Sequence, residues 1–478
     1  MAGKKKAQAE KENMVPVLGM QESTKTAAKS AKNTEPDYAK LLMEDFVHPR
    51  GGVDERIDMD IKRHRMGWGR IVLSDKDGKP VSGAKIRLKQ KTHEFMFGCN
   101  LFKLQDFETK KENAAYEKYF KKVFNNATVA FYWDTLEPTP GELRYTRDSR
   151  YISRRPPTDV AVDWCLENGI RPKGHWMFCD NFVPSWLPKS PREMMVFLEK
   201  RIAQLAERYG GKVTIWDAVN EAFSNNRWFS KNISWTVTPQ DYVYEVFKLA
   251  EKYFPNYTEL CYNDGNYVSY MPYARDNSPV YLLAKNLQMR GARLGGLGIQ
   301  YHMFGPVEDH ATNPVSHRYF DPYYHFKVLD QYCMLNIPLH MTETSFSTYP
   351  QLPRKKAEKL QADILHHFYR LWFSIPNMRS IVLWNFADNT AFGSENRFQA
   401  GILDKDLNPK PAYEELDRLI HEEWHTETMV ETDERGIADW NGFYGHYDME
   451  ITVGRTVIKE DFQLASDGCN EIRKDLEA

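Results

Sequence analysis

The chain has 478 residues, which is enough for one large domain and a smaller one. Its 64 basic and 66 acidic side chains give a formal net charge of −2, so nucleic acid and anionic membranes are not expected as partners. No apolar run approaches the ~20 residues of a transmembrane helix, and none near the N-terminus has the form of a signal peptide. A cytoplasmic protein is therefore expected, with a secreted protein as the alternative if a leader is missing from this sequence.

The first 93 residues divide into two parts of different character. Residues 1–50 are rich in Lys, Ala, Glu, Ser and Thr, which predicts a disordered or loosely packed polar arm. Within residues 51–93, the stretches 69–73 and 84–88 alternate between apolar and polar residues, and turn residues lie between them. This pattern predicts a β-hairpin, which needs further strands to pack on.

Candidate partner strands lie at the far end of the chain, in residues 423–478. Alternating stretches occur there at 442–447, 449–453 and 455–458. We therefore expect one small accessory β-sandwich built from both terminal segments, with two separate lobes as the alternative. Trp440, Phe443 and Tyr444 could bind carbohydrate on it, but they are expected to form its core.

Residues 94–422 show a repeated order of strand, loop and helix. The clearest helix is 191–209, which begins after a Ser190–Glu193 capping box and stops at Gly210-Gly211. Eight strands alternating with helices predict a (β/α)8 TIM barrel of the α/β class, with its chemistry at the carboxyl ends of the strands. The predicted strands are 95–101, 128–133, 171–178, 213–219, 259–263, 297–302, 339–342 and 381–386.

Two of these strands end next to a glutamate. Glu221 follows the fourth strand, within the segment 216–223, WDAVNEAF, and Glu343 follows the seventh. A single glutamate at the end of a strand is usually a solvated loop residue. Two carboxylates on one edge of a barrel can instead divide the general-acid and nucleophilic work that hydrolysis of a sugar–sugar bond needs.

The segment 216–223 closely resembles the acid/base segment of glycoside hydrolase family 10, the endo-β-1,4-xylanases. Further segments resemble that family in the same order over residues 94–420. They are Phe124-Asn125 with 133–138, Gly174-His175 with 184–186, 298–302, Thr342-Glu343, 381–384 and 408–413. The resemblance implies a retaining β-glycosidase that acts on carbohydrate and needs no metal or other cofactor.

The resemblance also implies roles for individual residues. Glu221 would be the acid/base and Glu343 the nucleophile, while Asn220 would hold the sugar 2-hydroxyl. The remaining candidates for substrate binding are His175, Gln300, His302, Trp384, Tyr132 and Asp180. The chemistry requires a raised pKa for Glu221, through its neighbour's charge and partial burial, whereas Glu343 is expected to stay ionised and to be oriented by His302.

The chain differs from the family at positions whose side chains bind the sugar. In the family the second strand carries Glu, Asn and Lys, the third carries Trp-His, and an Asp stands two residues after the nucleophile. The matching residues are Thr128, Val129 and Tyr132, then Cys179-Asp180, then Ser345. Because such partners set discrimination between sugars, their replacement makes a retaining β-glycosidase a better supported prediction than a xylanase. The favoured function is hydrolysis of a β-linked polysaccharide or oligosaccharide of the β-1,4-xylan type. The alternatives are the same machinery with another β-glycan or glycoside, and a barrel that binds glycan without cutting it.

Two signals for metal or disulfide chemistry are weak. His421–His425 matches the zinc-protease pattern HExxH, but it lies where the last barrel helix should end and has no evident third ligand. The six cysteines are scattered and contain no CxxC pair: Cys99, Cys165, Cys179, Cys261, Cys333 and Cys469. Neither a zinc site nor a disulfide framework is expected.

Overall fold

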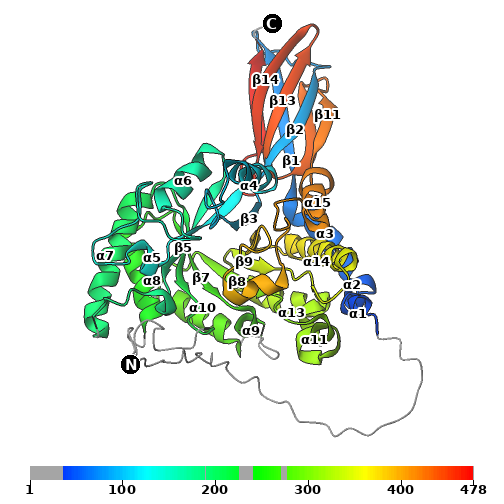
Figure 1. Cartoon of the computed structure of the whole chain (residues 1–478). Helices are drawn as coiled ribbons and strands as arrows, with labels where there is room; N and C mark the ends of the chain where they lie inside the picture. The colour runs from blue at the N-terminus through cyan, green and yellow to red at the C-terminus, as the bar shows by residue number, and fades with distance from the viewer. Residues whose placement is uncertain (1–35, 189, 225–240, 271–276, 477–478) are drawn as a thin grey trace, which may run out of the picture. The chain divides into compact units, whose positions relative to one another are not determined.

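A computed structural model describes residues 36–188, 190–224, 241–270 and 277–476. Eight parallel strands close into a barrel in the order β10-β3-β4-β5-β6-β7-β8-β9, surrounded by helices (Figure 1). The strands are β3 (Met96–Asn100), β4 (Asn126–Ala130), β5 (Arg171–Phe178), β6 (Ile215–Asn220), β7 (Glu259–Asp264), β8 (Gly296–His302), β9 (Leu339–Ser345) and β10 (Met378–Leu383). The predicted (β/α)8 barrel is confirmed.

The helices between these strands vary in length. The 19-residue helix α7 runs over Pro191–Tyr209 as predicted, and the Ser190 hydroxyl accepts the Glu193 backbone N–H at its start. The others are α4 (Lys110–Val123), α5 (Trp133–Leu136), α6 (Thr158–Glu167), α8 (Tyr242–Tyr253), α9 (Asn266–Ser269), α10 (Pro279–Met289), α11 (Val307–Thr312), α12 (Pro314–His317), α13 (Pro322–Cys333), α14 (Arg354–Ser374) and α15 (Pro411–Arg418). Short helical turns are η1 (Asp180–Phe182), η3 (Arg318–Phe320), η4 (Gly393–Phe398) and η5 (Leu419–Glu423). No helix within these described ranges combines the length and apolar character that a bilayer span requires.

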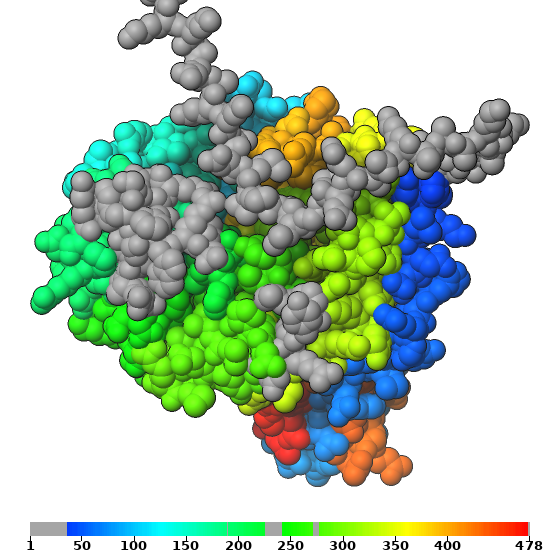
Figure 2. All heavy atoms as spheres, turned by 90° about the horizontal axis from the view of Figure 1, so that it is seen from below, coloured from blue at the N-terminus to red at the C-terminus, as the bar shows by residue number. Residues whose placement is uncertain are grey.

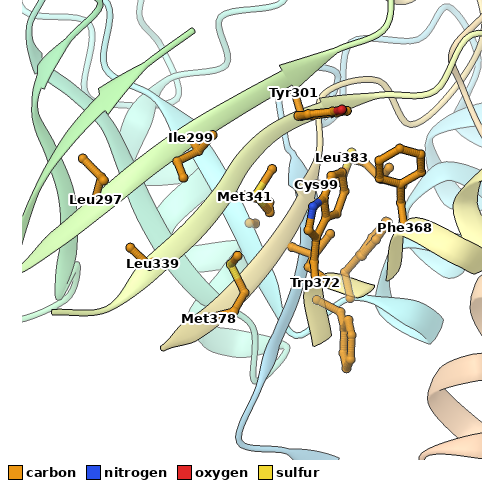
Figure 3. Packing of buried hydrophobic residues seen from close by; sticks show 14 of the residues in the cluster. Cys99, Leu297, Ile299, Tyr301, Leu339, Met341, Phe368, Trp372, Met378 and Leu383 are labelled. Carbon is orange, nitrogen blue, oxygen red and sulfur yellow. The ribbon is translucent and has the colours of Figure 1, made fainter. Parts of the chain in front are cut away.

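Strand β8 illustrates how the sequence separates the outer core from the barrel interior. Leu297, Ile299 and Tyr301 are fully buried and face the helix layer, where Tyr301 packs against Trp372 of α14 (Figure 3). Since successive side chains of a strand point to opposite faces, Gln300 and His302 point into the barrel. The strand therefore packs on its helices with one face and supplies polar groups to the interior with the other.

The terminal segments form two facing sheets. One has the strand order β12-β1-β15 and the other β11-β2-β13-β14, and their buried side chains make a core of their own that includes Trp440. The accessory β-sandwich is confirmed with Trp440 in its interior, whereas Phe443 is buried in the core of the barrel, where its ring lies near that of Phe373. The strands are β1 (Met66–Asp75), β2 (Lys85–His93), β11 (Glu427–Glu431), β12 (Ile437–Phe443), β13 (Gly445–Val453), β14 (Thr456–Leu464) and β15 (Glu471–Leu476).

The predicted hairpin of β1 and β2 is wrong. Strand β1 pairs with β12 and β15, whereas β2 pairs with β11 and β13, so the two strands lie in opposite sheets. The turn after β1 forms one isolated antiparallel β-bridge, between Ser74 and Pro80, and not a hairpin. The chain then crosses to the other sheet, because both strands need partners that only the C-terminal segment supplies.

The predicted polar arm is wrong for residues 38–50, and residues 53–65 are helical rather than part of the β-segment 51–93. These stretches form the helices α1 (Tyr38–Leu42), α2 (Glu44–Val47) and α3 (Val53–Arg65). The buried side chains of α3 recur every four residues, at Val53, Ile57 and Ile61, and they join the core of the barrel. In Figure 2 the blue N-terminal helices lie beside the yellow-green segment that contains α11 and α13. An ion pair of 2.6 Å between Arg56 and Asp330 connects the two. The rest of the expected polar arm, residues 1–35, lies outside the described residues.

Candidate active site

Two strand ends bring the predicted carboxyl groups together. The Gln300 side-chain nitrogen donates to the carboxylate of Glu221 at 2.7 Å and to that of Glu343 at 3.1 Å. One nitrogen atom thus bonds both acids. The two carboxylate oxygens that it bonds can therefore be no further apart than the sum of these two distances. Glu221 follows β6 with φ 57°, in the left-handed region that is costly for a non-glycine residue. Backbone strain of this kind persists where the surrounding structure over-determines it, typically at functional sites.

Local register shifts in β6 and β9 turn Asn220 and Glu343 toward the interior of the barrel. Ile299 of β8 pairs with Met341, but the next residue, Gln300, pairs with Glu343, so β9 carries one extra residue at Thr342. Without this bulge, strict alternation would turn Glu343 toward the helices. A similar shift in β6, between Asp217 and Val219 relative to β7, brings Asn220 opposite Asn263.

Glu343 is buried and lies among donors. The Asn263 amide donates to Glu343 Oε1 at 2.9 Å and to Asn220 Oδ1 at 2.7 Å. The Asn263 oxygen accepts the Thr342 hydroxyl at 2.6 Å, which fixes the orientation of the amide. The Nε2 atoms of His302 and His175 lie 3.5 Å and 3.8 Å from the Glu343 oxygens.

Buried charges hold His175 in place. Its Nδ1 lies 2.8 Å from Asp217, and the Lys173 ammonium lies 2.7 Å from the same carboxylate oxygen. Burial raises the pKa of Asp217, but the Lys173 charge and the bond to His175 outweigh it and lower that pKa overall. An ionised Asp217 that accepts the Nδ1 proton leaves Nε2 of His175 facing the nucleophile.

The other predicted residues line the same end of the barrel. Nδ1 of His302 lies 2.9 Å from the Ser345 hydroxyl, and its ring stacks on Phe304 at 4.9 Å between centroids. Trp384 directly follows β10, and its ring lies 5.3 Å from that of His175. Asp180 begins η1 at the end of β5 and is buried.

The substituted second strand forms an apolar wall. Tyr132, just after β4, is buried, and its ring lies 4.2 Å from that of Trp176 and 5.7 Å from that of His175. Ala130 of β4 packs in the same cluster as Tyr132 and Trp176, whereas Val129 is buried in the core on the helix side of the barrel. Sugar rings stack on such surfaces through their C–H faces, so this wall offers contact area in place of hydrogen bonds.

Three buried nitrogen atoms around the carboxyl groups have no hydrogen-bond partner within the described part of the chain. They are the Asn220 amide nitrogen, His175 Nε2 and the Trp176 indole nitrogen. Buried polar groups are normally paired, so polar groups left open at a cleft are suited to a ligand rich in hydroxyl groups, which both donate and accept. This supports the role predicted for Asn220.

The geometry described so far agrees with the comparisons to known proteins. The model of glycosyl hydrolase family 10 matches residues 88–418. The chain belongs to this family. Endo-1,4-beta-xylanase B of Thermotoga neapolitana is 26% identical over 336 residues, which cover 69% of this chain and 88% of that protein. Anti-sigma-I factor RsgI6 of Acetivibrio thermocellus is 25% identical, but this chain spans only 46% of its length.

The solved structures agree on the fold of the family-10 barrel. The crystal structure of xylanase 10B from Thermotoga petrophila RKU-1 in complex with xylobiose matches with a TM-score of 0.54 at 22% identity. The match covers 69% of this chain and 95% of that one. The terminal sheets account for part of the uncovered remainder, since the family model ends at residue 418 and begins within β2.

In this family-10 site, burial raises the pKa of both glutamates. The pKa of Glu221 is raised by burial and by the Asp264 charge, against the opposing bond from Gln300. Burial and the Glu221 charge raise the pKa of Glu343 to about 8, while charges on His175 and Lys173 oppose the shift. The raised pKa of Glu221 was predicted, but that of Glu343 differs from the expected ionised nucleophile. Two carboxyl groups this close share a proton near neutrality.

The raised pKa of Glu343 predicts a pH-dependent cost to stability. Unfolded glutamate titrates near pH ~4.3, so burial of Glu343 costs nothing below that pH, and stability is lost as pH rises through about 8. Glu343→Gln should therefore raise Tm at pH 8.5 by roughly 2 °C or more, and not at pH 4. Calorimetry at both pH values measures this.

The exposed Glu414 of α15 provides the matched control, because Glu414→Gln removes a charge that solvent already screens. Its Tm should match that of the wild type at both pH values. A Glu343→Gln gain of equal size at pH 4 and pH 8.5, or a loss at pH 8.5, would contradict the assigned cost.

One group of potential metal ligands lies in the barrel, away from the carboxyl pair. Glu259, Cys261 and His340 stand near the starts of β7 and β9, and Nε2 of His340 lies 2.6 Å from Glu259. This short contact is that of a direct hydrogen bond rather than of two ligands on one ion. His421 bonds Asp417 at 2.8 Å, and η5 ends at Glu423, so His421 and His425 do not share a helix face.

Sequence reasoning missed the residues that orient the predicted ones. Asn263 holds Glu343, and Asp264 accepts the backbone N–H groups of Phe223 at 2.9 Å and Ser224 at 3.0 Å, fixing the segment after Glu221. Asn263 ends the predicted strand 259–263 and Asp264 follows it, so a polar pair stands at this strand end as Asn220-Glu221 does at another.

Proposed function

We propose that the chain is a retaining glycoside hydrolase that cleaves β-1,4-linked, xylan-type glycans. The observation that carries this proposal is the single Gln300 nitrogen between the carboxyl groups of Glu221 and Glu343. Retaining enzymes hold their carboxyl groups about 5–5.5 Å apart, whereas inverting enzymes separate them by about 6.5–9.5 Å to admit a water molecule. The xylanase names of several relatives support the choice of substrate.

In the first step, a Glu343 oxygen attacks the anomeric carbon while protonated Glu221 gives its proton to the leaving oxygen. The glycosidic C–O bond breaks and a glycosyl-enzyme ester forms. The donors from Asn263 and Gln300 hold the attacking carboxylate in one orientation.

In the second step, Glu221 takes a proton from water, and the resulting nucleophile releases the sugar from Glu343. The negative charge moves from Glu343 to Glu221 and back during the cycle, which suits two acids that share one proton. The open Asn220 amide is placed to donate to the sugar beside the reacting carbon, where such bonds strengthen in the transition state.

A different β-glycan specificity is the second candidate. The apolar wall around Tyr132 and Trp176 favours it, because hydroxyl discrimination depends on hydrogen-bonding partners. A barrel that binds glycan without cutting it would not need to bury both glutamates at the cost described above.

The test is product analysis after incubation with linear xylohexaose. We expect xylobiose and xylotriose from the wild type and no products from Glu343→Ala. A folded wild type that leaves xylohexaose intact would overturn the xylan assignment. Hydrolysis of another β-linked glycan that also depends on Glu343 would then support the second candidate.

A further inference from the structure

Two consecutive arginines stand against the apolar wall of the active site. Arg154 and Arg155 lie in the connection between α5 and α6. The Arg155 guanidinium lies 3.7 Å from the centre of the Tyr132 ring, and both guanidinium groups flank Phe102, at 5.7 Å and 5.2 Å. The ring of Phe102 in turn packs edge-on against Trp384 at 5.2 Å. The two cations therefore lie beside the rings that line the predicted sugar subsite.

The backbone and one branch of each guanidinium are tied down. Arg154 has φ 60°, and its backbone N–H donates to Asp106 at 3.0 Å. Its Nη1 donates to the Thr390 carbonyl, while Nη1 of Arg155 donates to the Arg154 carbonyl at 2.9 Å. A strained residue held on several sides is typical of a ligand-binding segment.

The positive charges of these arginines are not neutralised by an ion pair within the described residues. Glu395 interacts electrostatically with Arg154, and Asp134 with Arg155, but neither acid forms a salt bridge with these arginines in this part of the chain. The Nε atoms of both arginines are buried without an acceptor. The Nη2 atoms of both arginines also have no protein acceptor in these ranges. Unlike the Nε atoms, they are not buried, so each Nη2 faces accessible space.

Half-buried guanidinium groups without a counter-charge are costly to a fold. An anion that occupies the space beside Nη2 would offset this cost. The planar guanidinium matches a carboxylate better than a hydroxyl group, because it presents parallel N–H donors to two oxygens. Within a glycan, a carboxylate is the group that distinguishes a uronic acid from a neutral sugar.

We propose that Arg154 and Arg155 form a subsite for an acidic sugar beside Tyr132, so that the preferred substrate is a β-linked glycan that carries uronic acid. This inference rests on the proposed function and narrows its substrate class. It also accounts for the apolar wall, because a carboxylate held by two arginines supplies a polar anchor that the cluster around Tyr132 does not.

The test compares two substrates that differ only in charge. One is a xylo-oligosaccharide with a glucuronic acid branch, and the other is its methyl ester. We expect wild-type kcat/KM to be about 10–100-fold higher for the acid, as for one or two charge-assisted hydrogen bonds. Glucuronan, which carries a carboxylate on every backbone sugar, and its methyl ester form a second pair that separates a backbone acid from a branch.

Variants of the two arginines then test whether Arg154 and Arg155 cause the preference for the acid over the ester. Arg155→Gln, which keeps a planar group on the Tyr132 ring, and Arg154→Gln should each lower the ratio of acid to ester toward one. Arg150→Gln is the control, since Arg150 lies in the same connection and pairs with Glu142 at 3.3 Å. It should leave the ratio unchanged.

The outcomes separate the two proposals. Equal wild-type rates on acid and ester in both pairs, or a preference that survives both arginine variants, would overturn the acidic subsite while hydrolysis itself continues. No hydrolysis of any of these substrates or of xylohexaose, by a folded protein, would instead overturn the proposed function.

Discussion

Glu343→Ala is expected to lower kcat for glycan hydrolysis on the order of 10⁴-fold or more, because it removes the atom that forms the covalent intermediate. The variant should remain folded, since its neighbours Asn263, Gln300 and His302 bond other groups or lie within reach of water. Steady-state kinetics with an aryl β-xyloside or a xylo-oligosaccharide measure the loss. Circular dichroism provides the control for folding.

Azide distinguishes the nucleophile from the acid/base. In Glu343→Ala it can occupy the space of the lost carboxylate and attack the anomeric carbon, so the expected product is the α-glycosyl azide. In Glu221→Ala, an activated substrate still forms the glycosyl-enzyme on Glu343, and azide then gives the β-glycosyl azide. A β product from Glu343→Ala, or kcat close to that of the wild type, would contradict the assignment of Glu343.

Glu221→Gln is expected to lower kcat/KM for xylo-oligosaccharides by about 10²–10⁴-fold, the usual contribution of a positioned general acid. Its neutral amide cannot donate a proton to the leaving oxygen. An aryl glycoside with a good leaving group needs no such proton, so formation of the glycosyl-enzyme from it should fall much less. Burst kinetics with both substrates measure the difference.

The pH profile gives an independent readout of Glu221. Its pKa is raised by burial, so the wild type loses activity as the pH rises through that pKa and the acid ionises. Glu221→Gln should lose this basic limb. A variant that keeps the wild-type basic limb, or that slows both substrates equally, would contradict the role of Glu221 as general acid.

Much of the fold could be predicted because its signals are local. Apolar runs such as 213–219, bounded by turn residues and separated by amphipathic stretches, predict buried parallel strands joined by helices. That order leaves few topologies other than the barrel. Since a barrel collects its strand ends on one face, Glu221 and Glu343 could be placed together although 122 positions separate them.

Other parts depended on contacts between distant segments. The N-terminal stretch reads as polar, yet Leu42, Phe46 and Ile57 are buried in the barrel core. The alternation of β1 and β2 predicts strands correctly, but their partners lie some 350 residues away along the chain, as Ile71 with Ala438 and Leu88 with Met449 illustrate. Local patterns favour a hairpin because they carry no information about such pairing.

The amino-acid pattern alone thus specified the barrel and the strand ends where the two glutamates stand, and it predicted β-structure in both terminal segments. The bounds of the C-terminal strands were wrong, because the predicted strand 442–447 spans the end of β12 and the start of β13. The direction of each side chain was set by tertiary structure. One extra residue in β9 turns Glu343 from the helix side to the interior, and the shift in β6 does the same for Asn220. A bulge forms because a strand must pair with both of its neighbours while the barrel closes. The alternation of apolar and polar residues in the sequence does not show where such a bulge lies.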